Sequence, residues 1–540
     1  MQDPLPLVHV LGRAPFAAKK QKRQVGTHKG GRRWIFPIDG IAETLSRTSR
    51  QPGAPSVAVR RRPQRAYEPG CGIGNTTLAL YLHRHPPRII EPRLHSRDYQ
   101  QRQNFLATMS SVLVVGCGVM GLSSAVALAE RGHQVVAMDS YEVPSPWSAA
   151  CDFNKIVRTE YTDKLYTELS VAALEKWRTS AVYRLTFNEC GRILVTPENH
   201  EGRREFEKLS IANLEAIGGG KRIEYWRGGA QLAEKFGFLS NNSVKPTTEI
   251  KWNPESGLAH AANALRLAHA RAEQLGVKFV FGDAGRVVAT HNENGAVYVE
   301  SADGSRRTAD QVLLSAGAAT GYLVDLGHQQ SATGLFVTHI KLTLEEYEKY
   351  KDIPVVFDGE MGYFFPPDPA TRILKIALPG SGASNYVSDP FGAGDKKSLP
   401  RYKIDNPNDT VPMDGYGQAK RILQKYVPDL AHHQLRDSKV CWIADTSDSH
   451  FIIDAVPQLP NLFVATGDSG HAFKFLPTIG DLIADKLEGK LAEKYENAWR
   501  WRADISPFDP TSCTWRVVSE PLDFSQVKWV KEDSHGIGKL

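Results

Sequence analysis

The sequence predicts an α/β fold in two parts: a Rossmann-like dinucleotide-binding domain assembled from discontinuous segments, and an α+β domain with a mainly antiparallel sheet. Three observations support this prediction. A strand–helix–strand pattern opens at residue 112 around a glycine-rich loop. Strands and helices alternate again from 261 to 315, and polar, aromatic-rich sequence from about 320 to 435 has the character of a separate sheet.

Changes in apolar periodicity define the individual elements. Residues 112–115 are an apolar run typical of a buried strand, 120–131 repeat with a helical period, and 134–139 form a second strand that ends in an acid. Further helices are expected at 165–177, 261–275 and 475–487, and further strands at 277–281, 286–290, 296–300, 311–315 and 462–466.

These elements divide the chain into seven segments. We expect the dinucleotide-binding domain to comprise residues 109–190, 256–320 and 436–505, and the second domain to comprise 191–255 and 321–435, with 1–108 an extension and 506–540 a C-terminal tail.

Length and composition indicate a folded chain of at least two domains, since 540 residues exceed the usual size of one domain several times. Hydrophobic residues at 41% and charged residues at 23% exclude wholesale disorder and collagen. The net charge of +6 conceals an asymmetry, because residues 1–108 hold 19 Lys and Arg against 6 Asp and Glu. This leader suits an organelle transit peptide, a nucleic-acid-binding tail or an extension outside the working fold, and no nucleic-acid partner is expected for the rest.

Metal, disulfide and membrane classes find little support. The six cysteines are isolated, without a CxxC pair or a histidine at metal-ligand spacing: Cys71, Cys117, Cys151, Cys190, Cys441 and Cys513. The uncharged run 112–129 has about the length of a bilayer span, but glycines interrupt it and its period changes midway. We therefore expect no metal site and no membrane partner.

A glycine loop follows the first strand. Gly116-Cys-Gly-Val-Met-Gly121 matches the G-x-G-x-x-G fingerprint, and Asp139 ends the next strand 18 residues later. The first glycine allows a tight turn, the second admits a pyrophosphate, and the third allows close helix–strand packing. We expect Gly116, Gly118, Met120 and Gly121 to bind a dinucleotide and Asp139 to accept hydrogen bonds from its ribose. The fingerprint alone does not distinguish FAD from NAD.

A second glycine-rich stretch lies in the leader. Glu68-Pro-Gly-Cys-Gly-Ile-Gly-Asn75 is similar to the loop of nucleoside-dependent methyltransferases. Such a loop follows a parallel-sheet strand, and residues 64–67 do not supply one. A methyltransferase is therefore disfavoured.

Two downstream stretches decide between the cofactors. Val440-Cys-Trp-Ile-Ala-Asp-Thr-Ser-Asp-Ser-His-Phe-Ile-Ile-Asp454 and Ala465-Thr-Gly-Asp-Ser-Gly-His-Ala-Phe-Lys-Phe475 resemble the flavin-binding region of the amine oxidase family of monomeric sarcosine, pipecolate, saccharopine and fungal fructosyl amino acid oxidases. The resemblance covers about 110–505 and implies FAD, held covalently by a thioether from Cys441. Without it, a lone cysteine would be interpreted as a small buried hydrophobe.

The same resemblance assigns further residues. The small-residue loop containing Gly467, Gly470 and His471 would direct N–H groups at the flavin, where reduced flavin carries negative charge. In Ser148-Ala-Ala-Cys-Asp-Phe-Asn-Lys-Ile-Val-Arg158, the resemblance implies that Ser148 and Lys155 contact the cofactor and that Arg158 reaches a substrate carboxylate. It also implies that Lys474 contacts the cofactor and is the second cation on that carboxylate, and that Val287 contacts the cofactor.

Lys375 stands among apolar residues in Ile373-Leu-Lys-Ile-Ala377, where an unpaired ammonium is expensive to bury. The resemblance implies that Lys375 holds a water and promotes electron transfer to O2; the alternative is a strand lysine that faces solvent. Tyr363 is a candidate aromatic wall of the substrate site.

The chain departs from the sarcosine oxidase pattern at Pro379 and Ile443, which replace a histidine and an aromatic residue of the substrate pocket. Arg158 favours a pipecolate or saccharopine oxidase, whereas Trp499-Arg-Trp-Arg502 resembles fructosyl amino acid oxidases. The choice between them stays open.

These features predict a monomeric FAD-dependent oxidase that converts a secondary amine in a small amino acid to an imine and reduces O2 to hydrogen peroxide. The alternatives are a flavin dehydrogenase with another electron acceptor and a non-catalytic FAD-binding protein. Gly538-Lys-Leu540 differs by one small residue from a peroxisomal address, so a cytoplasmic or peroxisomal location is expected.

Overall fold

The computed structural model describes residues 109–532 except 393–395, 458, 503–504 and 510–521. The basic leader, its Glu68–Asn75 glycine loop and the terminal Gly538-Lys-Leu540 lie outside the described residues. In the described part of the chain, no helix is long and apolar enough to cross a membrane.

The first sheet has six strands in the order β21-β22-β13-β1-β2-β9. Its strands are β1 (Ser111–Val115), β2 (Gln134–Met138), β9 (Lys278–Val280), β13 (Gln311–Leu314), β21 (Ile452–Val456) and β22 (Leu459–Thr466). All pairs are parallel except β21 with β22. The sheet thus combines three stretches of sequence, as predicted for a discontinuous Rossmann-like domain.

Helices α2 (Val119–Glu130), α6 (Ala261–Gln274) and α9 (Ile479–Leu487) pack together beside this sheet. Along β1, successive side chains enter different cores, since Val112 and Val114 pack with these helices. Leu113 and Val115 lie in the core that also contains side chains of β11. A strand buried on both faces explains why β1 is apolar at every position after Ser111.

The predicted helix 475–487 requires a correction, because α9 begins only at Ile479. Residues Phe473–Phe475 form a short 3-10 turn, η6, which is followed by Pro477. Proline has no N–H to donate, so it interrupts the helical hydrogen-bond ladder. The start of α9 instead packs on α2, where the Gly480 N–H donates to Ser123 Oγ at 2.8 Å. The N-terminus of α9 is therefore bound by a side chain of α2.

The second sheet has nine strands, eight of them in the order β20-β14-β17-β16-β15-β5-β7-β6, with β23 pairing with β17. They are β5 (Arg192–Val195), β6 (Glu224–Arg227), β7 (Glu249–Asn253), β14 (Ser331–Lys341), β15 (Val355–Asp358), β16 (Gly362–Phe364), β17 (Ile373–Ser384), β20 (Arg436–Asp445) and β23 (Leu522–Asp523). Within this sheet, only β15–β5 and β17–β23 are parallel among the described pairs. The mainly antiparallel second sheet is thus confirmed.

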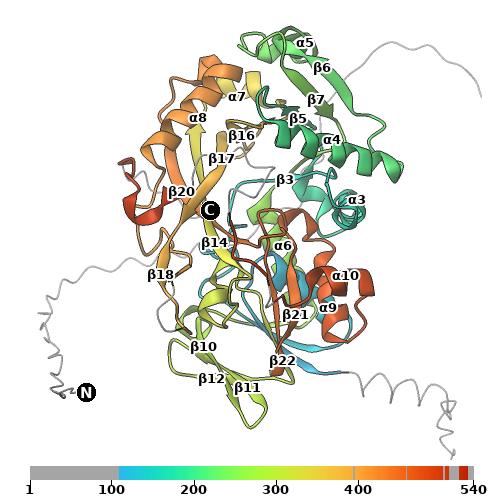
Figure 1. Ribbon diagram of the computed structural model, residues 1–540, viewed down its shortest axis with the longest axis vertical. Helices are drawn as coiled ribbons and strands as arrows, with labels where there is room; N and C mark the ends of the chain where they lie inside the picture. Colours follow the sequence, from blue (N-terminus) through green and yellow to red (C-terminus); the bar gives the residue numbers. More distant parts are fainter. Residues whose placement is uncertain (1–108, 393–395, 458, 503–504, 510–521, 533–540) are drawn as a thin grey trace, which may run out of the picture. The chain divides into compact units, whose positions relative to one another are not determined.

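Strand β20 carries Cys441 and pairs antiparallel with β14, so it belongs to the antiparallel sheet although the sequence groups it with the dinucleotide-binding segments. Figure 1 shows β20, β14 and β17 in this sheet, with α8 (Met413–Tyr426) nearby. Helix α8 contacts β17 directly. The pairing brings residues from two predicted domains into one sheet.

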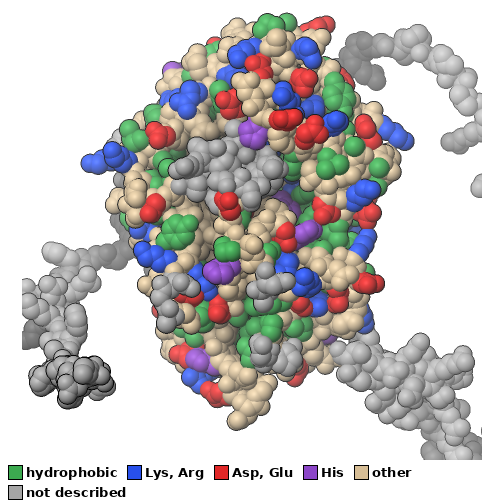
Figure 2. Space-filling view, in the orientation of Figure 1, with side chains coloured by type: hydrophobic (Ala, Val, Ile, Leu, Met, Phe, Trp, Pro, Cys, Tyr) green, Lys and Arg blue, Asp and Glu red, His purple; other side chains and the backbone are tan. Residues whose placement is uncertain are grey.

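The remaining elements are three small sheets and five further α-helices of the described chain. Three small sheets comprise β10 (Val287–Glu293), β11 (Ala296–Ser301) and β12 (Arg306–Thr308); β18 (Tyr386–Ser388) and β19 (Lys396–Ser398); and β3 (Lys155–Val157), β4 (Phe187–Asn188) and β8 (Gly257–Ala259). The other α-helices are α3 (Lys164–Thr179), α4 (Glu201–Ala216), α5 (Gly228–Lys235), α7 (Leu344–Tyr350) and α10 (Glu493–Trp499). On the face shown in Figure 2, acidic and basic side chains are interspersed, which is typical of a solvated surface.

Candidate functional site

A cavity of about 780 Å³, here called the nucleotide cavity, lies where β1, β2 and β13 end. Ligands of open α/β sheets bind at this edge. Most of the residues predicted to bind the cofactor or act beside it line this cavity: Gly116, Gly118, Met120, Asp139, Ser148, Lys155, Val287, Tyr363, Lys375, Cys441 and Gly470.

The glycine loop has the geometry that the fingerprint predicts. Gly116 has a positive φ of 101°, and a Cβ there would lie 2.5 Å from the Ser315 carbonyl oxygen. A Cβ on Gly121 would lie 1.8 Å from the Gly116 carbonyl oxygen, so this glycine allows the helix to pack against the loop. At Gly118 the nearest atom to an added Cβ is Ser148 Oγ at 3.5 Å. Its backbone is therefore open to a ligand in the cavity.

Asp139 stands just beyond β2 and fixes the glycine loop. Its Oδ2 accepts a hydrogen bond from the Cys117 N–H at 2.8 Å, and its Oδ1 accepts one from the Tyr141 N–H at 3.2 Å. Burial raises the pKa of the carboxyl group, although these N–H donors oppose the shift. Its contact with a ribose stays a prediction.

Two lysines share one buried carboxylate beside this cavity. Asp152 Oδ2 lies 2.5 Å from Lys375 Nζ and 2.9 Å from Lys155 Nζ, and we call these three residues the Lys–Asp–Lys cluster. The side chain of Lys375 is only 1% exposed, so the alternative of a solvent-facing strand lysine is wrong. Burial, reinforced by the charge of Lys155, lowers the pKa of Lys375 to about 8. The two lysines hold the pKa of Asp152 well below its ordinary value despite its burial.

Cys441 adjoins the same cluster. Its Sγ lies 3.7 Å from Lys155 Nζ and donates to the Ala149 carbonyl oxygen at 3.4 Å. The residue is 8% exposed and lines the nucleotide cavity. The thiol is thus directed toward the cavity and has a cation beside it.

A second cavity, also of about 780 Å³ and here called the polar cavity, adjoins the first. Five residues line both cavities, and we call them the shared wall: Lys155, Leu335, Tyr363, Gly470 and Phe473. Tyr363 stacks on Phe357, with ring centroids 5.1 Å apart, so its ring is held in place at this wall. The two cavities are therefore separated by four side chains and the backbone of Gly470.

Two cations predicted to bind a carboxylate, Arg158 and Lys474, both line the polar cavity. The guanidinium of Arg158 lies 4.4 Å from the ring centroid of Tyr161 and donates to the Glu160 carbonyl oxygen. Lys474 Nζ donates to Tyr161 Oη at 2.7 Å and to the His471 carbonyl oxygen at 2.8 Å. Burial and the charge of Arg158 lower the pKa of Lys474 well below its ordinary value. Within the described residues, neither cation forms an ion pair with a carboxylate.

Four predicted cofactor residues do not line the nucleotide cavity: Gly121, Gly467, His471 and Lys474. Lys474 lines the polar cavity, as described above. Gly121 serves the packing described above, and Gly467, with φ of 74°, forms a turn in which an added Cβ would lie 3.0 Å from Thr446. His471 lines the polar cavity instead, where its Nε2 lies 2.9 Å from the Ser449 carbonyl oxygen.

The sequence did not single out a charged network that also lines the polar cavity. Arg192 binds Glu160 at 2.8 Å, and Asn253 donates to the same carboxylate at 2.9 Å. Glu207 accepts from Arg203 and Lys251, each at 2.7 Å. The one available signal was an arginine in the otherwise apolar strand β5, which marks a buried charge that needs a partner.

The FAD dependent oxidoreductase (DAO) family matches residues 111–486 of the chain. The chain belongs to this family. As an FAD-dependent oxidoreductase it is similar to L-saccharopine oxidase of Schizosaccharomyces pombe, with 38% identity over 442 residues that cover 78% of this chain and 98% of the relative. It is 25% identical to monomeric sarcosine oxidase of a Bacillus species over 71% of this chain and 94% of that protein.

The fold comparison agrees with the sequence comparison. Fructosamine oxidase from Aspergillus fumigatus (Amadoriase II) superposes with a TM-score of 0.72 at 30% identity, and the match covers 79% of this chain and 98% of that one. A fructosyl peptide oxidase matches with the same TM-score at 28% identity, over 79% of this chain and all of that one.

The nucleotide cavity fits FAD. Gly116, Gly118 and Gly121 leave the backbone of the loop clear where a pyrophosphate binds in this motif, and an acid follows the next strand. The volume lies in the range of roughly 300–1,000 Å³ typical of small-molecule and cofactor sites.

Proposed function

We propose that the enzyme oxidises a secondary amine in an amino acid to an imine, with O2 as the electron acceptor and hydrogen peroxide as the second product. The observation that carries this proposal is that Arg158, which is partly buried, and Lys474, which is buried, both line the polar cavity and form no ion pair with a carboxylate of the described residues. A substrate carboxylate would supply the missing negative charge.

These cations would orient the substrate. A carboxylate held by Arg158 and Lys474 places the adjacent amine carbon toward the shared wall, where Tyr363 and Phe473 exclude water from one side. Fixing a reactant in this way lowers the entropic part of the barrier. Bound FAD supplies the two-electron acceptor for the amine.

Lys375 would serve the reaction with O2. It lines the nucleotide cavity, and Asp152 and the Asn154 carbonyl oxygen, at 2.5 and 2.8 Å, hold its ammonium in position. A fixed buried cation stabilises negative charge as it develops on O2 far better than a cation in water does. Peroxide production would suit the cytoplasmic or peroxisomal location that we expect for this enzyme.

The second feature that supports a substrate class is the charged network of the polar cavity. Its two ion pairs, Arg192–Glu160 and Arg203–Glu207, offer both signs of charge beyond the carboxylate cations. An amine with a long polar substituent would use these groups, whereas sarcosine has no polar group beyond its amine and carboxylate to bind them. We therefore favour a saccharopine-like or fructosyl amino acid substrate over sarcosine.

We test the function with a panel of saccharopine, fructosyl lysine, pipecolate, proline and sarcosine. Peroxide formed in proportion to O2 consumed, with saccharopine or fructosyl lysine giving the highest kcat/KM, is the expected result. Flavin reduction without peroxide would instead indicate a dehydrogenase with another acceptor. If no amine in the panel bleaches the flavin under anaerobic conditions, the proposal is wrong and a non-catalytic FAD-binding role is favoured.

We further propose that Cys441 forms a thioether with a ring methyl carbon of the flavin. The S–H bond and one C–H bond of the methyl group are replaced by the C–S bond, the flavin takes up the two electrons and two protons, and O2, the acceptor of the proposed reaction, reoxidises it to yield hydrogen peroxide. Its Sγ faces the nucleotide cavity, and the ammonium of Lys155 at 3.7 Å would stabilise negative charge on the attacking sulfur. Replacement Cys441→Ala is expected to release the flavin into the supernatant after acid precipitation, whereas the unaltered enzyme keeps it in the protein pellet. Cys190→Ala is the matched control, since Cys190 lines neither cavity. Flavin that stays in the pellet with Cys441→Ala would assign the bond to another residue.

A further inference from the structure

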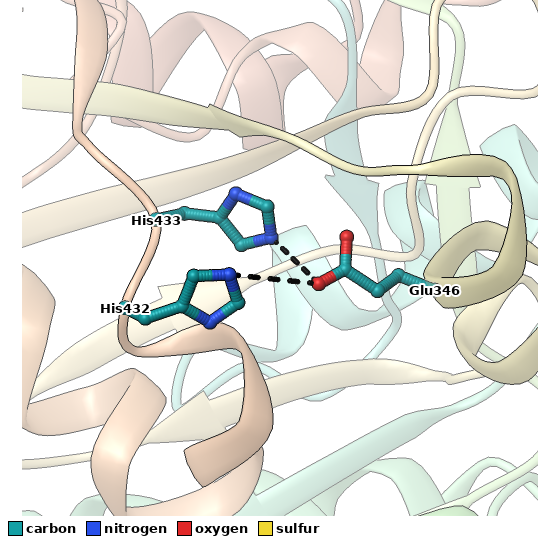
Figure 3. A group of neighbouring side chains, drawn as sticks. All are labelled: Glu346, His432 and His433. Atoms are coloured by element: carbon teal, nitrogen blue, oxygen red, sulfur yellow. Dashed lines mark hydrogen bonds and ion pairs between the residues drawn. The ribbon is translucent and has the colours of Figure 1, made fainter.

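We propose a zinc site formed by Glu346, His432 and His433. Figure 3 shows both imidazole rings directed at one carboxylate oxygen. One ligand atom from each residue can be chosen so that all three lie within 4.8 Å of one another, and this is the one such group among the described residues. None of the three lines the nucleotide cavity or the polar cavity, so the proposal is independent of the proposed function.

The distances suit a single ion. His433 Nε2 lies 2.9 Å and His432 Nε2 lies 3.8 Å from Glu346 Oε1. In a tetrahedral site with metal–ligand bonds of about 2.0–2.1 Å, neighbouring ligand atoms are about 3.3 Å apart. The two observed separations from the carboxylate oxygen lie on either side of this value, so shifts of about half an ångström would bring both nitrogens to it.

Hydrogen bonds to backbone groups also orient two of the three ligands, Glu346 and His432. Glu346 is the third residue of a capping box at the start of α7, where its Oε2 accepts a hydrogen bond from the Thr343 N–H at 2.8 Å. This leaves Oε1 to face the histidines. The Nδ1 of His432 lies 2.7 Å from the Asp429 carbonyl oxygen. Because a carbonyl only accepts, Nδ1 carries the proton, and in the neutral ring the lone pair is on Nε2, the atom directed at Glu346.

The chemistry of the ligands indicates the ion. Two imidazole nitrogens and one carboxylate oxygen suit borderline metals such as Zn²⁺, whereas Ca²⁺ and Mg²⁺ prefer oxygen ligands alone. The ammonium of Lys420 donates to the carbonyl oxygens of Ala431 and His433, and that of Lys349 pairs with Asp429, so both lysines have partners other than the three ligand atoms. Three protein ligands would leave the fourth position of the ion to water.

A metal here would tie together distant parts of the chain. Glu346 belongs to α7, whereas the histidines lie between the 3-10 turn η5 (Pro428–Leu430) and β20. A bound ion stabilises the folded state because the unfolded chain does not hold these ligands together. Zn²⁺ is therefore expected to raise the melting temperature.

The test is titration of the full-length holoenzyme with Zn²⁺ alone, followed by calorimetry and thermal unfolding. We expect one saturable site per chain in the unaltered protein. Glu346→Gln, His432→Ala and His433→Ala should each weaken this binding at least about tenfold, and the increase in melting temperature should be lost with it. Glutamine can still complete the capping box, so Glu346→Gln removes the charge and keeps the cap.

His291→Ala is the matched control, since His291 forms a 2.9 Å pair with Glu300 but belongs to no group of three potential metal ligands among the described residues. It should bind Zn²⁺ as the unaltered protein does. Absence of a saturable site, or equal loss of binding in His291→Ala, overturns the proposal. Co²⁺ in place of Zn²⁺ gives a second readout, because a tetrahedral site with two nitrogen ligands has a visible absorption that the three variants should lack.

Discussion

Lys375→Met is expected to lower the rate constant for reaction of the reduced enzyme with O2 by about 10²–10³-fold, the usual cost of removing one preorganised electrostatic contact. Anaerobic oxidation of the amine should change little, because Lys375 lines the nucleotide cavity and is absent from the lining of the polar cavity. Asp152 keeps Lys155 as its partner in this variant, so the buried carboxylate is not left without a cation.

The measurement separates the two half-reactions. The enzyme is first reduced with substrate under anaerobic conditions and then mixed with O2 in a stopped-flow instrument, with the flavin absorbance followed in each step. Lys235→Met is the control, since Lys235 forms an exposed pair with Glu224 and lines neither cavity. An unchanged O2 reaction in Lys375→Met would exclude Lys375 from this step.

The O2 reaction should also depend on pH through the same side chain. Burial lowers the pKa of Lys375 to about 8, so its ammonium is present below this pH and is lost as the pH rises above it. The rate constant for O2 is therefore expected to fall above about pH 8, toward the value of Lys375→Met. In that variant the fall should be absent, and a fall that persists would assign the titration to another group.

Arg158→Met is expected to lower kcat/KM about ten- to hundredfold, equivalent to the roughly 1.5–3 kcal/mol of a hydrogen bond to a charged group. The effect should depend on the substrate carboxylate, because Arg158 faces the polar cavity with Lys474 and has no ion-pair partner among the described carboxylates. Reactivity toward the corresponding carboxamide substrate should change little.

The comparison of acid and carboxamide makes this prediction specific. The unaltered enzyme should prefer the acid, and Arg158→Met should lose most of this preference. Arg227→Met serves as the control, since Arg227 is 66% exposed and pairs with Glu249 on the neighbouring strand. Equal loss of activity on acid and carboxamide in Arg158→Met would indicate a structural role for Arg158 and contradict the proposed carboxylate site.

Local features of the site could be predicted from the sequence because their parts are close along the chain. The glycine loop spans six residues, and the acid that fixes it, Asp139, lies 22 residues from its partner Cys117. The spacing of the glycines predicts the loop, and the periodicity of the strand predicts the position of Asp139. The structure confirms α2 and α6 to within one residue of the predicted bounds, because each is bounded by clear changes of period.

Pairings between distant residues could not be predicted in the same way. Lys375 and Asp152 are 223 residues apart, and neither local period nor spacing indicates that they meet. The pairing of β20 with β14 could not be predicted either, because alternation of apolar side chains indicates a strand but not the strand beside it. The ion pair of Arg192 with Glu160 in the polar cavity was not predicted, because a single charged residue in a strand does not indicate which residue it pairs with.

The hydrogen bond between Ser123 and Gly480 joins residues 357 positions apart, so a growing chain can form it only late in synthesis. During synthesis, α2 and the first strand leave the ribosome long before β22 and α9, which complete their surroundings. Closing so long a loop is slow, so the apolar face of α2 stays unpacked against α9 until late in folding. We therefore expect ribosome-bound chains that end before residue 450 to require chaperones, and the nucleotide cavity to form only after synthesis is nearly complete.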